Sequence, residues 1–219
     1  VAGYTETILR IMDLIFGALA EVDPAISNGS SYGTINALSI AGHQPNGDRW
    51  VMFTFYGGGL GGSPESDGLS HGNAPLSTAT IPPIEILEST YPIRYTRWAL
   101  RPDSGGAGKH RGGLGADYEI ELLDENAEVF AFGDRGRFPP PGVAGGGPSA
   151  LNRISFDVAG HELIPPLASK IVGVKLHKGD RVRIASPGGG GYGDPADRSL
   201  EAIERDLRLG YTTVEGSGT

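Results

Sequence analysis

Apolar side chains recur with two different periods along this chain. Over residues 5–20 they return every three or four positions, which is the spacing of one face of an amphipathic α-helix. This expected apolar stripe comprises Ile8, Ile11, Met12, Ile15 and Leu19. Residues 199–209 show the same spacing, and Gly210 follows as a typical helix stop. We therefore expect a helix near each end of the sequence.

Between these helices the pattern changes to runs rich in β-branched and aromatic residues, which are typical of strands. Asn46-Gly47-Asp48 and Lys178-Gly179-Asp180 are tight-turn sequences that favour antiparallel hairpins. The expected strands are residues 34–41, 49–56, 93–100, 116–122, 129–133, 152–158, 172–176 and 181–185. Residues 63–81 are irregular, and residues 84–90 are expected to form a short helix or an extended stretch.

These elements predict an α+β fold. Its β-rich body consists mainly of antiparallel strands, with an N-terminal helix, a C-terminal helix and long glycine-rich loops, because hairpin turns outnumber helical crossovers. The length of 219 residues fits one large domain or two small ones, and a soft boundary is expected near residues 102–115.

Glycine-dense blocks interrupt the pattern at residues 57–62, 105–115 and 186–195. Glycine loses more backbone freedom on folding than any other residue, so a chain that keeps 36 of them needs positive φ angles or close backbone approach in many places. We interpret these blocks as loops whose amides face a ligand or a partner chain.

Composition narrows the class of protein. The net charge of −8 and the pI near 5.1 argue against a nucleic-acid-binding or anionic-membrane-binding surface, which needs clustered Lys and Arg. The sequence has no cysteine, which excludes disulfides, cysteine-ligated metals and a thiol nucleophile within these residues. No apolar run approaches the ~20 residues of a membrane-spanning helix, and we expect a cytoplasmic protein.

The segment after the first glycine block contains Asp67, His71 and Asn73. Asp and His at this spacing could supply part of a metal site, although two ligands are fewer than zinc needs, so a hydrogen-bonded loop is the simpler interpretation. Glu85 and Glu88 could act as paired catalytic carboxylates, but more often such a pair braces its surroundings.

The second glycine block contains Lys109 and Arg111. Cations on a glycine scaffold could hold a phosphate or carboxylate group, or the block could be a solvated connection between two strands, and the sequence leaves both interpretations open. Residues 186–194 lack the Gly-Lys-Ser/Thr ending of a phosphate-binding P-loop, and we favour a structural turn before the last helix.

Several motifs together resemble the hydantoinase B/oxoprolinase family. They lie at residues 5–20, at 57–62 with Asp67-Gly68, at 83–88 with Tyr91-Pro92, at 103–115 and at 186–195. Their order and spacing agree with the family along nearly the whole chain. Family members are more than twice as long, and the resemblance covers only their C-terminal portion, so residues 1–219 are identified as that portion of a hydantoinase B-type subunit.

The resemblance implies a multi-subunit, ATP-dependent enzyme. A hydantoinase A-type partner would bind ATP and Mg²⁺, and the remainder of the B-type subunit would hold a divalent metal such as Zn²⁺ or Mn²⁺. No metal ligand carries over to these residues, so this chain is expected to bind no cofactor by itself and to be inactive in isolation. Asp67, His71, Asn73, Lys109 and Arg111 are the candidates to meet substrate or phosphate, supported by Glu85 and Glu88.

The family contains two chemistries, and a scaffold role is a third possibility. A split B-type chain suits a carboxylase that acts on a ketone such as acetophenone with bicarbonate, and this is the branch that we expect. The alternatives are an ATP-dependent cyclic amide hydrolase, such as a hydantoinase or 5-oxoprolinase, and a non-catalytic subunit that only packs a hetero-oligomeric complex.

Overall fold

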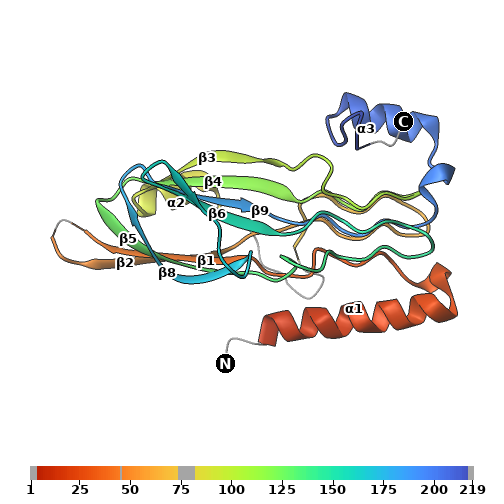
Figure 1. Cartoon of the computed structure of the whole chain (residues 1–219), viewed down its shortest axis with the longest axis horizontal. Coiled ribbons are helices and arrows are strands. Elements are labelled where there is room, and N and C mark those ends of the chain that lie inside the picture. Colours follow the sequence, from red (N-terminus) through yellow and green to blue (C-terminus); the bar gives the residue numbers. More distant parts are fainter. Residues whose placement is uncertain (1–3, 45, 74–81, 217–219) are drawn as a thin grey trace.

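Two antiparallel sheets are stacked at one end of the molecule in the computed structural model, which describes residues 4–44, 46–73 and 82–216 (Figure 1). The first sheet has the order β2 (Arg49–Phe55), β1 (Ala37–His43), β5 (Asn126–Phe132), β8 (Lys170–His177). The second sheet has the order β3 (Ile93–Leu100), β4 (Ala116–Leu122), β9 (Arg181–Ala185), β6 (Arg153–Val158), β7 (His161–Leu163).

Alternation along the strands builds the core between the two sheets. In β2 every second residue is buried, and β4 follows the same period, so one face of each sheet turns towards the other. The largest fully buried side chains of this core include Leu38 and Met52 from the first sheet and Tyr118 and Phe156 from the second. Apolar burial of this kind is the main stabilising contribution to the sandwich.

Beyond the sandwich the chain continues as extended segments that lie side by side, here called the glycine bundle (Figure 1). The bundle comprises residues 29–32, 58–62, 104–113, 141–147 and 186–193. Its central segment bonds to several others at once: Gly190 donates to the Ser30 carbonyl (2.8 Å) and accepts from Gly62 (2.9 Å), while Gly191 donates to Gly147 (2.9 Å). The hydrogen bonds of the bundle therefore run in more than the two directions available to a sheet strand.

Close approach of backbones explains the glycines of the bundle. A Cβ on Gly112 would lie 1.8 Å from the Gly189 carbonyl oxygen, and one on Gly59 would lie 1.9 Å from that of Gly113. Neither Gly59 nor Gly112 needs a positive φ angle. The amides that we expected to face a ligand or a partner chain instead bond largely to one another. Residues 186–191 form the buried centre of this bundle, and the chain continues from them towards the last helix.

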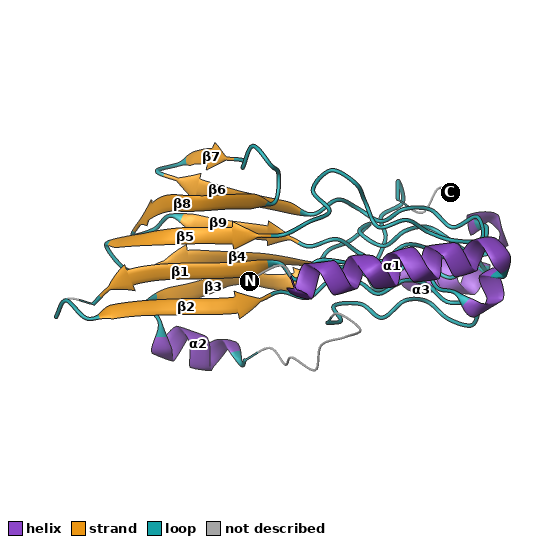
Figure 2. Cartoon of the chain, turned by 90° about the horizontal axis from the view of Figure 1, so that it is seen from below, coloured by secondary structure: helices purple, strands orange, loops and turns teal. Residues whose placement is uncertain are grey.

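Two helices flank the bundle. The helix α1 (Tyr4–Val22) lies along one side of the bundle and α3 (Leu200–Arg208) lies on the other side, while α2 (Ile84–Thr90) lies at the edge of the sandwich (Figures 1 and 2). The hydroxyl of Ser199 caps α3 by accepting from the amide of Ala202 (3.3 Å). Short 3-10 turns follow α1 and precede α3, at Pro24–Ile26 and Pro195–Asp197. Among the described helices, none has the length and apolar character needed to cross a bilayer.

The expected α+β class, its antiparallel strands and its two terminal helices are confirmed. Three local differences have physical reasons. Residues 34–36 precede β1 instead of belonging to it, because Asn36 has a left-handed backbone conformation, with φ of 45°, that interrupts an extended strand. The strands β5 and β8 begin earlier than expected, and the unexpected β7 is an exposed strand held by pairing to β6. Part of the irregular segment expected at 63–81, residues 74–81, lies outside the described residues.

Candidate functional site

The loop at residues 67–73 runs beside residues 111–114, and this brings two sequence-predicted candidates together. The amide of Gly68 donates to the Arg111 carbonyl (2.7 Å), and the amide of Arg111 donates to Asp67 Oδ1 (2.8 Å). The two glycine-flanked loops are thus a single rigid feature, with an ionic end at Asp67 and an aromatic end at His71.

At the ionic end, the carboxylate of Asp67 is held by arginines that follow the last glycine block. Arg198 donates to both of its oxygens (2.7 and 2.9 Å), and Arg205 of α3 donates to Oδ2 (2.6 Å). Burial alone would raise the pKa of Asp67, but the hydrogen bonds and charge of Arg198, together with Arg111, lower it to about 2. Asp67 therefore stays ionised at neutral pH.

A second carboxylate, Asp206 of α3, completes this ionic cluster. Its side chain is only 2% exposed and accepts from Arg111 Nε (3.1 Å) and Arg198 Nη2 (2.6 Å). Arg111 also donates to the Gly112 carbonyl (2.6 Å), and its guanidinium lies over the ring of Tyr211. Arg111 is therefore buried and paired, and in this structure it fastens α3 to the glycine bundle.

Lys109 lies at the edge of the same bundle, but in a different environment. Its side chain is exposed, and it forms no ion pair with any residue that the structure describes. Its backbone is fixed, because its amide donates to Gly193 (3.3 Å) and its carbonyl accepts from Arg198 (3.0 Å). Of the two predicted cations, Lys109 is thus the one whose charge is available to an external anion.

At the aromatic end, His71 adopts a left-handed backbone conformation with φ of 52°, which is uncommon for a residue other than glycine. Its Nε2 lies 2.9 Å from Trp98 Nε1 and 2.9 Å from the Tyr118 hydroxyl. An indole nitrogen can only donate, so Nε2 is the unprotonated acceptor and Nδ1 carries the proton. Burial lowers the pKa of His71, which agrees with a neutral ring at pH 7.

Aromatic rings hold this histidine in place. Trp98 and Tyr118 are in edge-to-face contact with ring centroids 4.9 Å apart, and the Tyr118 hydroxyl also lies 3.1 Å from the Gly57 carbonyl. Next to them the hydroxyls of Tyr56 and Tyr95 are hydrogen-bonded to each other (2.8 Å). Burial raises the pKa of Tyr95 to about 12, so its hydroxyl stays protonated and can only donate or accept hydrogen bonds at neutral pH.

Asn73, Glu85 and Glu88 are the remaining candidates from the sequence. Asn73 Oδ1 accepts from the Tyr32 hydroxyl (3.3 Å). Glu88 accepts from the amide of Tyr95 (2.6 Å) and so ties α2 to β3, whereas Glu85 is exposed on α2. Glu88 thus braces β3 through its carboxylate, and a catalytic role of the pair stays a prediction.

The arrangement does not fit a metal ion. Within the described ranges, no group of three or more His, Asp or Glu side chains is placed to hold one. The carboxylate of Asp67 is surrounded by arginines, and Nε2 of His71 already accepts from the Trp98 indole and lies 2.9 Å from the Tyr118 hydroxyl. Residues 186–194 lack the Lys and Ser/Thr of a P-loop, and their amides bond largely within the bundle, so they do not fit a nucleotide phosphate in that way.

Sequence reasoning missed the partners that define both ends of the site. Arg198, Arg205 and Asp206 reach Asp67 and Arg111 only because α3 folds back onto the bundle. A signal was present in α3, where Asp206 is the buried residue of an amphipathic helix, but helical spacing cannot say which polar residue is buried. Trp98 faces His71 because β3 and the loop meet in space, which sequence spacing does not reveal.

Comparisons with known proteins agree on one family. Residues 1–195 match the family model described as hydantoinase B/oxoprolinase. The chain is 32% identical to the caprolactamase beta subunit of Pseudomonas jessenii, covering 86% of this chain and 34% of that protein. It is also 32% identical to the B-type subunit of a putative D-/L-hydantoinase from Pseudomonas sp. strain NS671, covering 94% and 34%.

Solved structures show the same fold. An ATP-dependent caprolactamase from Pseudomonas jessenii is 28% identical, with a TM-score of 0.77 over 91% of this chain and 36% of that one. A nucleotide-free acetone carboxylase is 23% identical, with a TM-score of 0.69 over 86% of this chain and 30% of that one, and this likeness concerns the fold alone. The chain spans about a third of the length of these relatives.

Proposed function

This chain belongs to the hydantoinase B/oxoprolinase family, and we propose that it is the C-terminal portion of a B-type subunit in an ATP-dependent enzyme that opens a cyclic amide. The observation that supports this substrate class is the pair of relatives at 32% identity, which are named for caprolactam and hydantoin. Their names describe those proteins, and the transfer to this chain is our proposal. In this proposal, residues 1–219 together form the C-terminal portion of such a subunit.

The proposal assigns nucleotide and metal to other parts of the complex. A hydantoinase A-type subunit would bind ATP with Mg²⁺, and the remainder of the B-type subunit would hold a divalent metal such as Zn²⁺ or Mn²⁺. We also propose that the protein is cytoplasmic, as expected from the sequence, because an enzyme that uses ATP needs a compartment that contains it.

In this proposal, the loop at residues 67–73 and Lys109 line one side of an active site that is completed by other parts of the complex. The loop at 67–73 is held at both ends, by the ionic cluster around Asp67 and by the aromatic cluster around His71. Rigid positioning of this kind is what a substrate-binding loop requires. Lys109 is the residue that we assign to an anionic group of the substrate or its activated form, because it is exposed on a fixed backbone and has no competing carboxylate among the described residues.

A ketone carboxylase is the second candidate. It is the branch that we expected from the sequence, with acetophenone as the example substrate, and a fold shared with acetone carboxylase is compatible with it. A purely structural subunit is the third interpretation, and it differs from the others in what a loop substitution would do.

The test uses the complete purified assembly with ATP. Hydantoin, 5-oxoproline or caprolactam would be supplied in one series, and acetone or acetophenone with ¹⁴C-bicarbonate in another. Ring-opened amino acid formed without bicarbonate supports the proposal, and ¹⁴C incorporated into a ketone overturns it in favour of the carboxylase. Lys109→Ala should lower turnover while the assembly stays intact, and unchanged turnover would favour the structural role.

A further inference from the structure

The helix α1 turns both polar and apolar side chains towards its own domain. Glu6 Oε1 accepts from the Thr34 hydroxyl (3.1 Å), and Asp13 accepts from the Ser30 hydroxyl (2.7 Å) and from Arg135. Leu9 is the buried apolar residue of this inner face. The contact between α1 and the bundle therefore combines hydrogen bonds and ion pairs with apolar contacts, because Leu9 clusters with Ile35 and the half-buried Met12 and Phe16 face Leu60 and Leu69.

The outer face of α1 also carries apolar side chains. Ile11, Leu14, Ile15 and Val22 recur at helical spacing and are exposed, with Leu14 at 72%. Only part of the apolar stripe expected from the sequence thus packs inwards, since Ile11 and Ile15 belong to the exposed face. A surface helix of a self-contained domain turns polar residues outwards, so the second, exposed apolar face of α1 is the unusual feature.

Exposed apolar side chains also occur outside α1. A hollow of about 390 Å³ lies between Arg10 of α1 and Lys170 of β8, and the exposed side chains of Phe138 and Leu167 line it. On the first sheet beyond it, Phe53 packs edge-to-face on Phe55 with ring centroids 5.0 Å apart. Figures 1 and 2 show α1 and the first sheet on the same side of the molecule.

We call this surface the docking face. It comprises Ile11, Leu14, Ile15, Val22, Phe53, Phe55, Phe132, Phe138, Leu167 and Val172. Large exposed apolar surfaces in soluble proteins mark interaction sites, and the exposed side chains of this face are the candidates for one.

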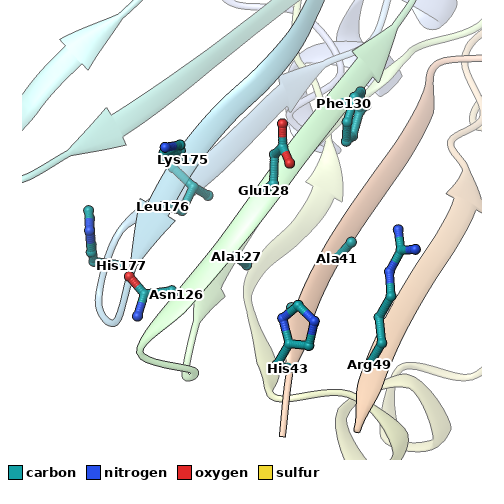
Figure 3. Close-up of a pocket in the computed structure, with 11 residues that line it drawn as sticks. Ala41, His43, Arg49, Asn126, Ala127, Glu128, Phe130, Lys175, Leu176 and His177 are labelled. Carbon is teal, nitrogen blue, oxygen red and sulfur yellow. The ribbon is translucent and has the colours of Figure 1, made fainter. Parts of the chain in front are cut away.

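The docking face has a polar border at the far end of the first sheet. There, His43, Arg49, Glu128, Lys175 and His177 surround a hollow of about 530 Å³ (Figure 3). An apolar centre with a charged border is the general anatomy of a protein–protein interface. The same sheet thus changes from an aromatic surface near α1 to a charged one at its hairpin end.

We propose that the docking face is covered by the further polypeptide that B-type relatives carry outside the region matched by this chain. This inference rests on the part of the proposed function that places these residues in a B-type subunit, and not on the substrate. The chain accounts for 34% of the caprolactamase beta subunit and 36% of the solved caprolactamase chain, so about two thirds of each lies outside the match. An apolar helix face beside an aromatic sheet face suits a permanent contact of the kind that buries more than roughly 2,000 Å².

The occupant can be identified by photo-crosslinking in the complete assembly. The photo-crosslinking residue p-benzoylphenylalanine would replace Leu14 in one sample and Leu200 in a control sample. Leu200 on α3 is a suitable control because it is similarly exposed, at 76%, but lies on the opposite side of the bundle. We expect Leu14 to crosslink to peptides of the B-type region outside the match, and Leu200 not to. Crosslinks from Leu14 to a second copy of this chain or to the A-type subunit, or no crosslink, would overturn the proposal.

Matched substitutions measure the contribution of the face. Leu14→Glu should weaken association with the remaining B-type polypeptide roughly tenfold or more, because it places a charge in an apolar contact, whereas Leu200→Glu should leave assembly unchanged. Both variants should unfold at the temperature of the unsubstituted chain when isolated. Equal effects of the two substitutions on assembly would contradict the proposal.

Activity separates this inference from the proposed function. If the assembly opens cyclic amides while Leu14 crosslinks elsewhere, the docking proposal fails and the function stands. If Leu14 crosslinks as expected but no cyclic amide is opened, the function fails and the docking proposal stands on the family relationship.

Discussion

In the β-sandwich, side chains fill the space between the two sheets, whereas in the glycine bundle the backbones themselves are in contact. Phe156 illustrates the first arrangement, being fully buried among apolar neighbours. Gly112 illustrates the second, since no side-chain atom fits between it and the Gly189 carbonyl. The sandwich is therefore stabilised mainly by apolar burial, and the bundle mainly by backbone hydrogen bonds that must offset the large conformational entropy of glycine.

The strongest way to test this contrast is to add one methyl group to the bundle. Gly112→Ala should prevent the bundle from forming and destabilise the chain by roughly 4 kcal/mol or more, because backbone atoms cannot move aside as a flexible side chain does. Gly17→Ala is the matched control: nothing lies within 4 Å of its added Cβ, and alanine should stabilise α1 by about 1 kcal/mol. Urea unfolding of both variants measures the difference, and similar midpoints would refute close backbone approach.

Removing a side chain should affect the sandwich next most strongly. Phe156→Ala should lower the free energy of unfolding by about 3–5 kcal/mol, through lost burial and the cavity left behind. Phe53→Ala on the outer face, where the ring is 57% exposed, should change the stability of the isolated chain by about 1 kcal/mol or less. Thermal unfolding followed by circular dichroism compares the stabilities of the two variants. A larger loss of stability for Phe53→Ala would mean that the buried core does not lie between the two sheets.

The ionic cluster between the bundle and α3 should rank third. Arg111→Ala should cost about 3 kcal/mol, because it removes one partner of the buried Asp206 carboxylate. Lys109→Ala, two residues away, should change stability by less than about 0.5 kcal/mol. Denaturant unfolding of the single variants separates the structural cation from the exposed one, and equal losses would mean that Lys109 also has a structural partner.

The smallest expected effect is a pH dependence from Asp67. Its folded pKa of about 2 lies below the ordinary value of 3.8, so its contribution is fully present above about pH 4 and is lost as the pH falls towards 2. The contribution is roughly 2 kcal/mol. Asp67→Asn should flatten the dependence of unfolding free energy on pH between 2 and 4, and an unchanged slope in this variant would assign the acid sensitivity to other carboxylates.

Much of the sandwich could be predicted from the sequence, because a period of two directly reflects a sheet with one buried face. The strand expected at 93–100 coincides with β3, and the one expected at 116–122 coincides with β4. β7 could not be found in this way: its three residues are all exposed and have no apolar period, so only pairing with β6 makes them a strand.

The bundle and the candidate site were less predictable, because their geometry depends on contacts between distant segments. The glycine blocks correctly indicated close backbone approach, but not that the blocks contact one another. Asp67 and Arg111 were singled out as loop residues, and the structure brings them together. That Arg198 and Asp206 would neutralise them follows only from the docking of α3. Whether these loops meet a substrate stays a prediction.

The order of segments along the chain has a consequence for biosynthesis. Every strand of the sandwich ends by Ala185, whereas residues 186–193 supply the central segment of the bundle. A nascent chain can therefore complete its sandwich while its bundle still lacks the segment that joins it, leaving amides of residues such as Gly62 and Gly106 without their acceptors. We expect translation products that stop before residue 186 to have a folded sandwich and an unfolded bundle. Quality-control proteases should therefore degrade these products faster than the full-length chain.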